Sequence, residues 1–180
     1  RELKVKEAKE IARIVAELSE EAGQHESVIL LDLKIISYLD FTFAKARLAL
    51  DQKAIKPIIN TTGKIALINA RHPFIHKDKV VPINVFLNEK ESMLITGPNT
   101  GGKTVALKTV GLLTVMMQSG LLIPAKDKSE LCVYTGIYAD IGDEQSISQS
   151  LSTFSAHMKN IVSILENCDD RSLILLDELG

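Results

Sequence analysis

The most informative part of the sequence is residues 97–104, which read Gly97-Pro98-Asn99-Thr100-Gly101-Gly102-Lys103-Thr104. This stretch satisfies the pattern G-x-x-x-x-G-K-[ST], in which the glycines let the backbone approach phosphate oxygens closely. The apolar residues 92–96 before it predict a short strand, and the residues after it predict a helix whose N-terminus favours an anion. We therefore expect an ATP-binding loop in which Lys103 binds phosphate and Thr104 is a ligand of Mg²⁺. The alternative is a glycine-rich turn that binds no ligand.

A second pattern lies at residues 172–178, which read Ser172-Leu173-Ile174-Leu175-Leu176-Asp177-Glu178. The apolar run predicts a buried parallel strand, and open α/β sheets bind their ligands at the C-terminal ends of such strands. We expect Asp177 to hold Mg²⁺, directly or through water, and Glu178 to act as general base toward an attacking water. A carboxylate at this second position favours hydrolysis over phosphate transfer to a nucleotide. The alternative is a solvated strand end.

Between these two patterns, residues 140–155 are rich in Ser, Gln and acidic side chains and lead into a helix with an apolar face. In ATPases of the ABC class, a Ser-rich helix start binds the γ-phosphate held by the opposite subunit. We expect Ser152 to make this contact in trans, with plain helix capping as the alternative. Asp143 or Gln145 is a further candidate for orienting water or metal, and His157 is interpreted as a packing or solvated residue.

The rest of the chain predicts two parts. Residues 1–22 and 26–52 show helical periodicity with a short connection, which predicts an antiparallel helical hairpin. From about residue 57 the order becomes strand, glycine-rich turn, helix, strand, polar loop, helix and strand. The expected fold class is therefore α/β, with a helical segment over 1–56 and a P-loop (ABC-type) nucleotide-binding domain over 57–180.

The composition is that of a globular protein, with 180 residues of which 46% are hydrophobic and 24% charged. Twenty-one basic against 23 acidic residues give a net charge of −2, which argues against a basic nucleic-acid-binding module. Cys132 and Cys168 are too few for a disulfide framework. We expect no membrane span and no signal peptide, and hence a cytoplasmic protein. The missing initiator Met and the abrupt end at Gly180 lead us to expect an excised piece of a longer chain.

In combination, the motifs resemble the MutS family, and more closely its second bacterial type. The family motifs are Pro98-Asn99 in the phosphate loop, Arg71-His72-Pro73 upstream, Ser152-Thr153-Phe154 at the helix start and Leu176-Asp177-Glu178-Leu179-Gly180 at the acidic strand. The second type is indicated by Thr100, residues 104–113, Asp140-Ile141-Gly142-Asp143-Glu144-Gln145-Ser146, Ser150-Leu151-Ser152-Thr153-Phe154 and Leu39-Asp40-Phe41-Thr42-Phe43-Ala44-Lys45-Ala46-Arg47. The resemblance covers about residues 27–180.

The resemblance implies a homodimer with composite ATP sites that closes as a clamp on nucleic acid under the control of ATP and Mg²⁺. It implies that residues 1–56 end a lever-helix core domain and that 57–180 form most of the ATPase domain, truncated just after the acidic strand. The implied partner is DNA, with branched DNA and the ribosome with its rRNA as further candidates, and no membrane. Second-type members resemble proteins linked to suppression of homologous recombination and to ribosome rescue. Val80 or Val81 would lie near the adenine.

The sequence also departs from the family pattern. It contains no mismatch-reading domain and no Phe-x-Glu tripeptide, and the C-terminal nuclease domain of the second type is missing. The family's dimer-facing residues would follow Gly180. We therefore expect this chain by itself to bind nucleotide weakly and to hydrolyse it poorly or not at all, and we expect its last strand to be an exposed apolar edge.

Two other functions stay open. One is an ABC-class chromosome-maintenance ATPase with coiled-coil arms, although the segment between Lys103 and Ser152 is too short for a long arm. The other is a non-catalytic nucleotide-gated scaffold, in which ATP locks a dimer and hydrolysis is incidental. Glu178 argues against the scaffold because a lock needs no general base.

Overall fold

The computed structural model describes residues 2–98, 101–142 and 150–177, with side chains in the last range described from His157 onward. The chain divides into two compact units, Arg1–Ala46 and Arg47–Gly180, which we call the first and second unit. The division falls within a helix, and each unit is described by itself. The assignment of 1–56 and 57–180 to named domains stays a prediction.

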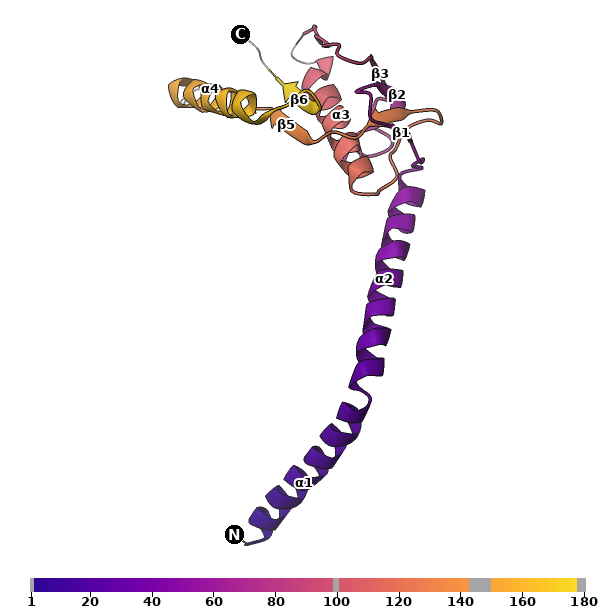
Figure 1. Cartoon of the computed structure of the whole chain (residues 1–180), viewed down its shortest axis with the longest axis vertical. Coiled ribbons are helices and arrows are strands. Elements are labelled where there is room, and N and C mark those ends of the chain that lie inside the picture. The colour runs from indigo at the N-terminus through magenta and orange to yellow at the C-terminus, as the bar shows by residue number, and fades with distance from the viewer. Residues whose placement is uncertain (1, 99–100, 143–149, 178–180) are drawn as a thin grey trace. The chain divides into compact units, whose positions relative to one another are not determined.

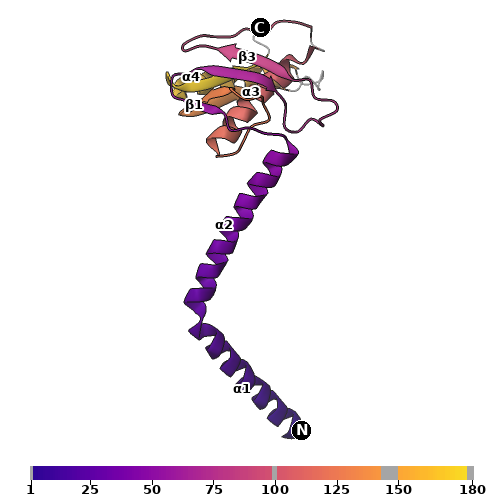
Figure 2. The ribbon, with the colours of Figure 1, turned by 90° about the vertical axis from the view of Figure 1, so that its right-hand side faces the viewer.

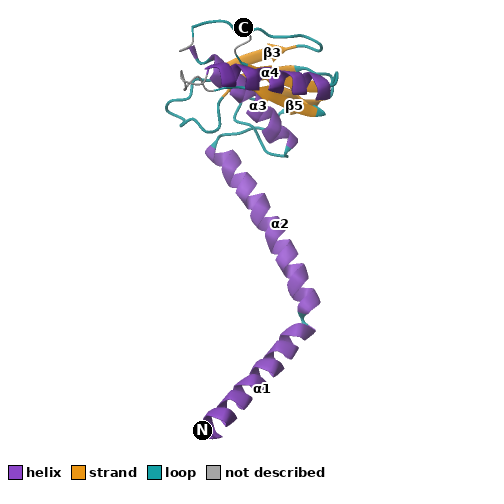
Figure 3. Ribbon diagram, turned by 90° about the vertical axis from the view of Figure 1, so that its left-hand side faces the viewer, coloured by secondary structure: helices purple, strands orange, loops and turns teal. Residues whose placement is uncertain are grey.

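The first unit is helical, and it is not the expected hairpin. Helix α1 spans Glu2–Gln24 and α2 spans Glu26–Asp51, so His25 alone separates them (Figure 3). The amide of Val28 already donates to the carbonyl of His25, which means that α2 begins at once. An antiparallel helical hairpin needs a loop of several residues to reverse the chain. The hairpin prediction is therefore wrong, and none of the residues of α1 and α2 is buried.

Helix α2 is apolar on all sides, as expected, yet its large side chains are exposed. Examples are Leu33, Ile36 and Phe43, all more than half exposed. A helix of this composition is typical of one buried between neighbours. The part of the chain that the structure describes does not supply those neighbours.

Helix α2 ends inside the second unit with a left-handed residue, Lys53, at φ +47°. The amide of Ala54 donates to the carbonyl of Ala49 at 2.8 Å, a common way to close a helix. The guanidinium of Arg71 donates to the carbonyl of Gln52 at 2.8 Å. Arg71 of the expected Arg-His-Pro turn thus satisfies a carbonyl at a helix end that has no partner within the helix.

The described residues of the second unit form short strands and helices, shown in Figures 1 and 2. Its elements are β1 Ile58–Asn60, β2 Ile65–Ala70, β3 Ile83–Leu87, α3 Lys103–Gln118, β4 Glu130–Cys132, β5 Gly136–Asp140, α4 Ser150–Asn167 and β6 Ser172–Leu176. The first sheet has the order β1-β4-β2-β3, with β1 parallel to β4 and β2 antiparallel to β3 and β4. The second sheet is the parallel pair β5-β6.

The expected fold class, a P-loop (ABC-type) domain with an N-terminal helical hairpin, is wrong for this structure. Residues 92–96 form no strand, and Leu94 is 82% exposed. A strand needs a neighbour to pair its N–H and C=O groups. Among the described residues, β3 pairs only with β2 and β6 only with β5, so neither joins the segment that leads into the glycine-rich loop. Two separate sheets form in place of one continuous parallel sheet.

Helix α3 connects the two sheets because it packs against β4, β5 and β6. Its buried residues Val110 and Leu113 belong to one core with Leu67 of β2 and Leu175 of β6. Gly111 makes the approach to β6 possible, since a Cβ at this position would lie 2.5 Å from Cδ1 of Leu175. The absence of a side chain at residue 111 therefore sets how closely α3 lies on β6.

We expect Gly111→Ala to destabilise the second unit by about 1–3 kcal/mol, because the added methyl group overpacks a filled core. Urea unfolding followed by circular dichroism measures this change. An unchanged unfolding midpoint would show that α3 shifts away from β6 without cost.

The same substitution at Gly23 of α1 is the matched control. A Cβ there meets no atom within 4 Å. Gly23→Ala should leave the second unit unaffected and favour the helix by about 1 kcal/mol, since alanine is the better helix former.

Candidate functional site

The glycine-rich loop ends at the N-terminus of α3. Lys103 and Thr104 are the first two residues of the helix, and Gly102 precedes them at φ +79°, in the left-handed region that favours glycine. The amide of Gly101 donates to the carbonyl of Pro98 at 2.9 Å, so the loop turns tightly. Asn99 and Thr100 lie outside the described residues.

The ammonium group of Lys103 reaches across this loop. Its Nζ donates to the carbonyl oxygen of Gly97 at 2.7 Å. The positions where a Cβ would stand at Gly97 and Gly102 have no atom within 4 Å, so the loop is open on these sides. The first turn of α3 adds backbone amides that lack partners within the helix. The loop therefore offers the cation, the amide donors and the space that a phosphate group requires.

Asp177 directly follows β6 and is half-buried. Its amide donates to the carbonyl of Asp140 at 2.9 Å, so the structure brings together the C-terminal ends of β5 and β6. Glu178 lies outside the described residues. A shared role of Asp177 and Thr104 at one metal ion stays a prediction.

The remaining predicted site residues lie in other parts of the sequence. Ser152 falls in the first turn of α4, and its side chain is outside the described part of the structure, as are Asp143 and Gln145. Val80 is half-buried and its amide donates to the carbonyl of His76 at 3.0 Å. Val81 is 79% exposed. The adenine contact of Val80 or Val81 stays a prediction.

A polar cluster around one buried carboxylate lies at the end of β5, and the sequence analysis missed it. Asp140 is 7% exposed. One carboxylate oxygen lies 2.9 Å from Nδ1 of His157, and the other accepts a hydrogen bond from Nδ2 of Asn160 at 2.8 Å. The sequence did contain a signal for this cluster. Asp140 stands at a strand end, and His157 and Asn160 are three residues apart on the following helix, which places them on one face.

The cluster also changes the ionisation of Asp140. Burial by itself would raise the pKa of this carboxyl group. The hydrogen bonds from Asn160 and His157, together with the charge on His157, outweigh burial and lower the pKa below its usual value. Asp140 is therefore held as a carboxylate beneath α4.

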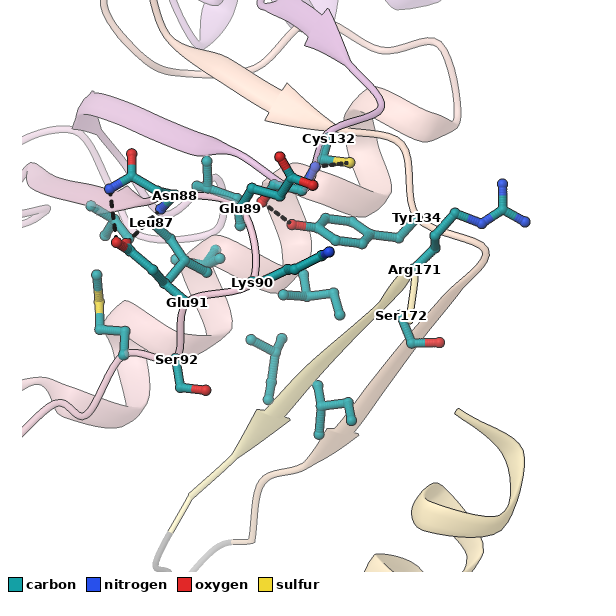
Figure 4. A pocket seen from close by; sticks show the side chains of 18 of the residues that line it. Leu87, Asn88, Glu89, Lys90, Glu91, Ser92, Cys132, Tyr134, Arg171 and Ser172 are labelled. Carbon is teal, nitrogen blue, oxygen red and sulfur yellow. Dashed lines mark hydrogen bonds between the residues drawn. The ribbon is translucent and has the colours of Figure 1, made fainter. Parts of the chain in front are cut away.

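A cavity of about 700 Å³ lies in the second unit, and it is not the expected nucleotide site (Figure 4). Strand β6 forms one wall, and α3 and residues 87–95 line other parts of it. In that last segment Glu91 accepts hydrogen bonds from the backbone and side-chain amides of Asn88, which lower its pKa. Of the described residues of the loop 97–104, none lines the cavity, nor does Asp177.

The connection that follows β2 contains a histidine whose pKa is shifted, His72. Burial lowers the pKa of His72, and the positive charge of Lys108 on α3 lowers it further. The amide of Phe74 donates to Nδ1 of His72 at 3.3 Å, a long contact within the expected turn.

The described residues hold neither a membrane-spanning helix nor a metal-binding cluster. No helix among them is long and apolar enough to cross a membrane. Within the same residues, no group of three or more His, Cys, Asp and Glu side chains is arranged to hold a metal ion.

Known proteins are similar in sequence to this chain over part or all of its length. Residues 93–180 match the family described as MutS domain V. The chain is 58% identical over its whole length to "Endonuclease MutS2" of Ruminiclostridium cellulolyticum, and 55% identical to that of Caldanaerobacter subterraneus. It is 57% identical over 99% of its length to that of a Geobacillus species. It spans 23% of the length of each of these relatives. This similarity to MutS domain V over residues 93–180 also stands against the expected P-loop (ABC-type) class.

We predict that the imidazole of His72 titrates below the value of about 6.5 found for an unperturbed histidine. The unfolded chain then takes up this proton at a higher pH than the folded protein does. This contribution to the free energy of unfolding is therefore complete above pH 6.5 and is lost as the pH falls below it. NMR titration of His72 measures the pKa.

Removal of the charge at residue 108 tests the electrostatic part of this shift. In Lys108→Met the pKa of His72 should rise toward its usual value, whereas Lys159→Met on α4 should leave it unchanged. A His72 pKa at or above 6.5 in the unmodified protein would contradict the effect of burial.

Proposed function

We propose, from the support that both comparisons give to the MutS2 family, that this chain binds and hydrolyses ATP as part of a MutS-type protein that acts on DNA. The relatives carry the name endonuclease, and nuclease activity belongs in this proposal to a part of the protein outside this chain. The cytoplasm is the proposed location. The chain spans 23% of the length of such a relative, and in this proposal it turns over ATP poorly by itself.

The observation that carries the proposal is the position of Lys103. Its ammonium group crosses the glycine-rich loop to Gly97 at 2.7 Å, directly at the N-terminus of α3. A phosphate group bound in this loop replaces the Gly97 carbonyl oxygen as a hydrogen-bond partner of the Lys103 ammonium group. Charged phosphate oxygens form stronger hydrogen bonds to an ammonium group than a carbonyl oxygen does. The glycines at 97, 101 and 102 leave room for its approach, and residues Pro98, Asn99 and Thr100 complete the loop.

Thr104 and Asp177 supply the oxygen donors that Mg²⁺ prefers. The Thr104 hydroxyl stands one residue after Lys103, and the Asp177 carboxylate follows the end of β6. When bound, Mg²⁺ neutralises charge on the phosphates. Glu178, the next residue, accepts a proton from the attacking water, and Val80 or Val81 contacts the adenine.

The proposed assembly is a homodimer in which Ser152 of each chain completes the ATP site of the other. ATP binding and hydrolysis then open and close a clamp on nucleic acid. DNA is the proposed partner, and branched DNA and ribosomal RNA are the candidates for the specific target. The proposed roles of the whole protein are suppression of recombination and ribosome rescue.

We expect Lys103→Ala to weaken Mg·ATP binding by roughly tenfold to a hundredfold, because a hydrogen bond to a charged group is worth about 1.5–3 kcal/mol. Isothermal titration calorimetry measures the affinity. Lys108→Ala, one turn further along α3, is the control and should change it little. Equal affinities for Lys103→Ala and the unmodified chain would refute the loop as the phosphate site, and rapid ATP turnover by this chain alone would contradict the expected weak activity.

The composite site predicts a dimer that depends on ATP. In the full-length protein with Glu178→Gln to block turnover, molar mass from light scattering should double with saturating Mg·ATP. Adding Ser152→Arg should abolish this change, while Ser163→Arg at an exposed site on the same helix should preserve it. A mass that does not respond to Mg·ATP would remove the support for a contact of Ser152 in trans.

A further inference from the structure

We infer that Asp140 is a positioning residue that couples the acidic end of β6 to helix α4. Its backbone holds Asp177, and its carboxylate holds His157 and Asn160. The inference rests on the proposed function, because Asp177 is the expected metal ligand and α4 begins with the segment expected to reach the opposite subunit.

The backbone connection runs along the parallel pair β5-β6. Asp140 stands opposite Leu176 in the register of these strands. One residue later, the amide of Asp177 donates to the carbonyl of Asp140 at 2.9 Å. The position of Asp177 therefore depends on where β5 ends, and Asp140 is the last residue of that strand.

The side-chain connection fixes α4 at two points. Each carboxylate oxygen of Asp140 contacts a different residue, and His157 and Asn160 are one turn apart on the helix. One contact would leave α4 free to rotate about it, whereas two contacts from one carboxylate define its rotation. Strand β5 is also the element against which α4 packs most closely (Figure 3).

Gly142 supplies a third point of contact. A Cβ at this residue would lie 2.7 Å from Cε1 and 2.9 Å from Nε2 of His157. The imidazole ring thus occupies the space beside Gly142, two residues beyond Asp140. The His157 ring therefore lies against both the segment that follows β5, at Gly142, and the carboxylate of Asp140.

Another carboxylate in the second unit shows the contrast. Asp169 is exposed and accepts hydrogen bonds from Thr135 and Ser172, which shape the turn before β6. Those contacts lie at the opposite end of β6 from Asp177. Of these two carboxylates, Asp140 is the one that joins a helix to the strand end that carries Asp177.

Hydrogen exchange tests the connection without nucleotide. In the full-length protein, Asn160→Ala should speed the exchange of the Asp177 amide by roughly threefold to tenfold, the effect of weakening one hydrogen bond. Asn167→Ala is the matched control, since this side chain donates only to the Ser163 carbonyl within α4 among the contacts described. Unchanged exchange at Asp177 in both Asn160→Ala and His157→Ala would overturn the inference.

A conservative variant separates positioning from general loss of structure. His157→Gln retains a side-chain donor that can reach Asp140 and should restore most of the protection lost in His157→Ala. Rapid amide exchange throughout β2 in Asn160→Ala or His157→Ala would show that the variant has unfolded. The milder Gly142→Ala, whose methyl group displaces the His157 ring, is then measured in its place. Normal protection of Asp177 in folded Gly142→Ala would then count against the inference.

Binding with and without metal tests the consequence for the proposed site. Asn160→Ala should weaken the binding of Mg·ATP by roughly threefold to tenfold and leave the binding of ATP in excess EDTA unchanged. An equal loss under both conditions would indicate a structural role alone and overturn the coupling. If the unmodified protein binds no ATP, the proposed function fails, and the exchange measurement still decides whether Asp140 couples β6 to α4.

Discussion

The close contact of α3 with β6 is the constraint on which the second unit depends. Helix α3 begins with Lys103 at the end of the glycine-rich loop, and β6 ends just before Asp177. The two elements approach each other only because Gly111 leaves space for Leu175. Neither sheet is large enough to position both the start of α3 and the end of β6 by itself. The packing of one helix against the strands of both sheets therefore holds the loop and the acidic residue in one unit.

Local patterns in the sequence predicted several elements, and features that depend on neighbours were not predicted. Strand β6 and helices α3 and α4 follow from periodicity and from a short apolar run. The hairpin of residues 1–52 and the strand at 92–96 are wrong, because a turn needs enough loop residues and a strand needs a partner. The fold class was wrong for the same reason, since it assumed one continuous sheet.

The candidate site likewise has one part that the sequence predicted and one part that it did not. A motif identified the loop from Gly97 to Thr104 because phosphate binding by backbone amides demands glycines at fixed spacing. No such rule identifies Asp140, whose partners His157 and Asn160 reach it only through the packing of α4 on β5. His157 was interpreted as a packing or solvated residue, and its hydrogen bond to a buried carboxylate depends on tertiary structure that periodicity does not contain.

The hydrogen bond from Lys103 to Gly97 has a consequence for the entropy cost of the proposed binding of ATP. A lysine side chain in solution samples many rotamers, and ordering it on binding costs about 0.5–1.5 kcal/mol. Here the ammonium group is already directed across the loop, at 2.7 Å from a carbonyl oxygen. The proposed ATP would then meet a side chain whose rotamers are already restricted, so that binding would incur little of this entropy cost at residue 103.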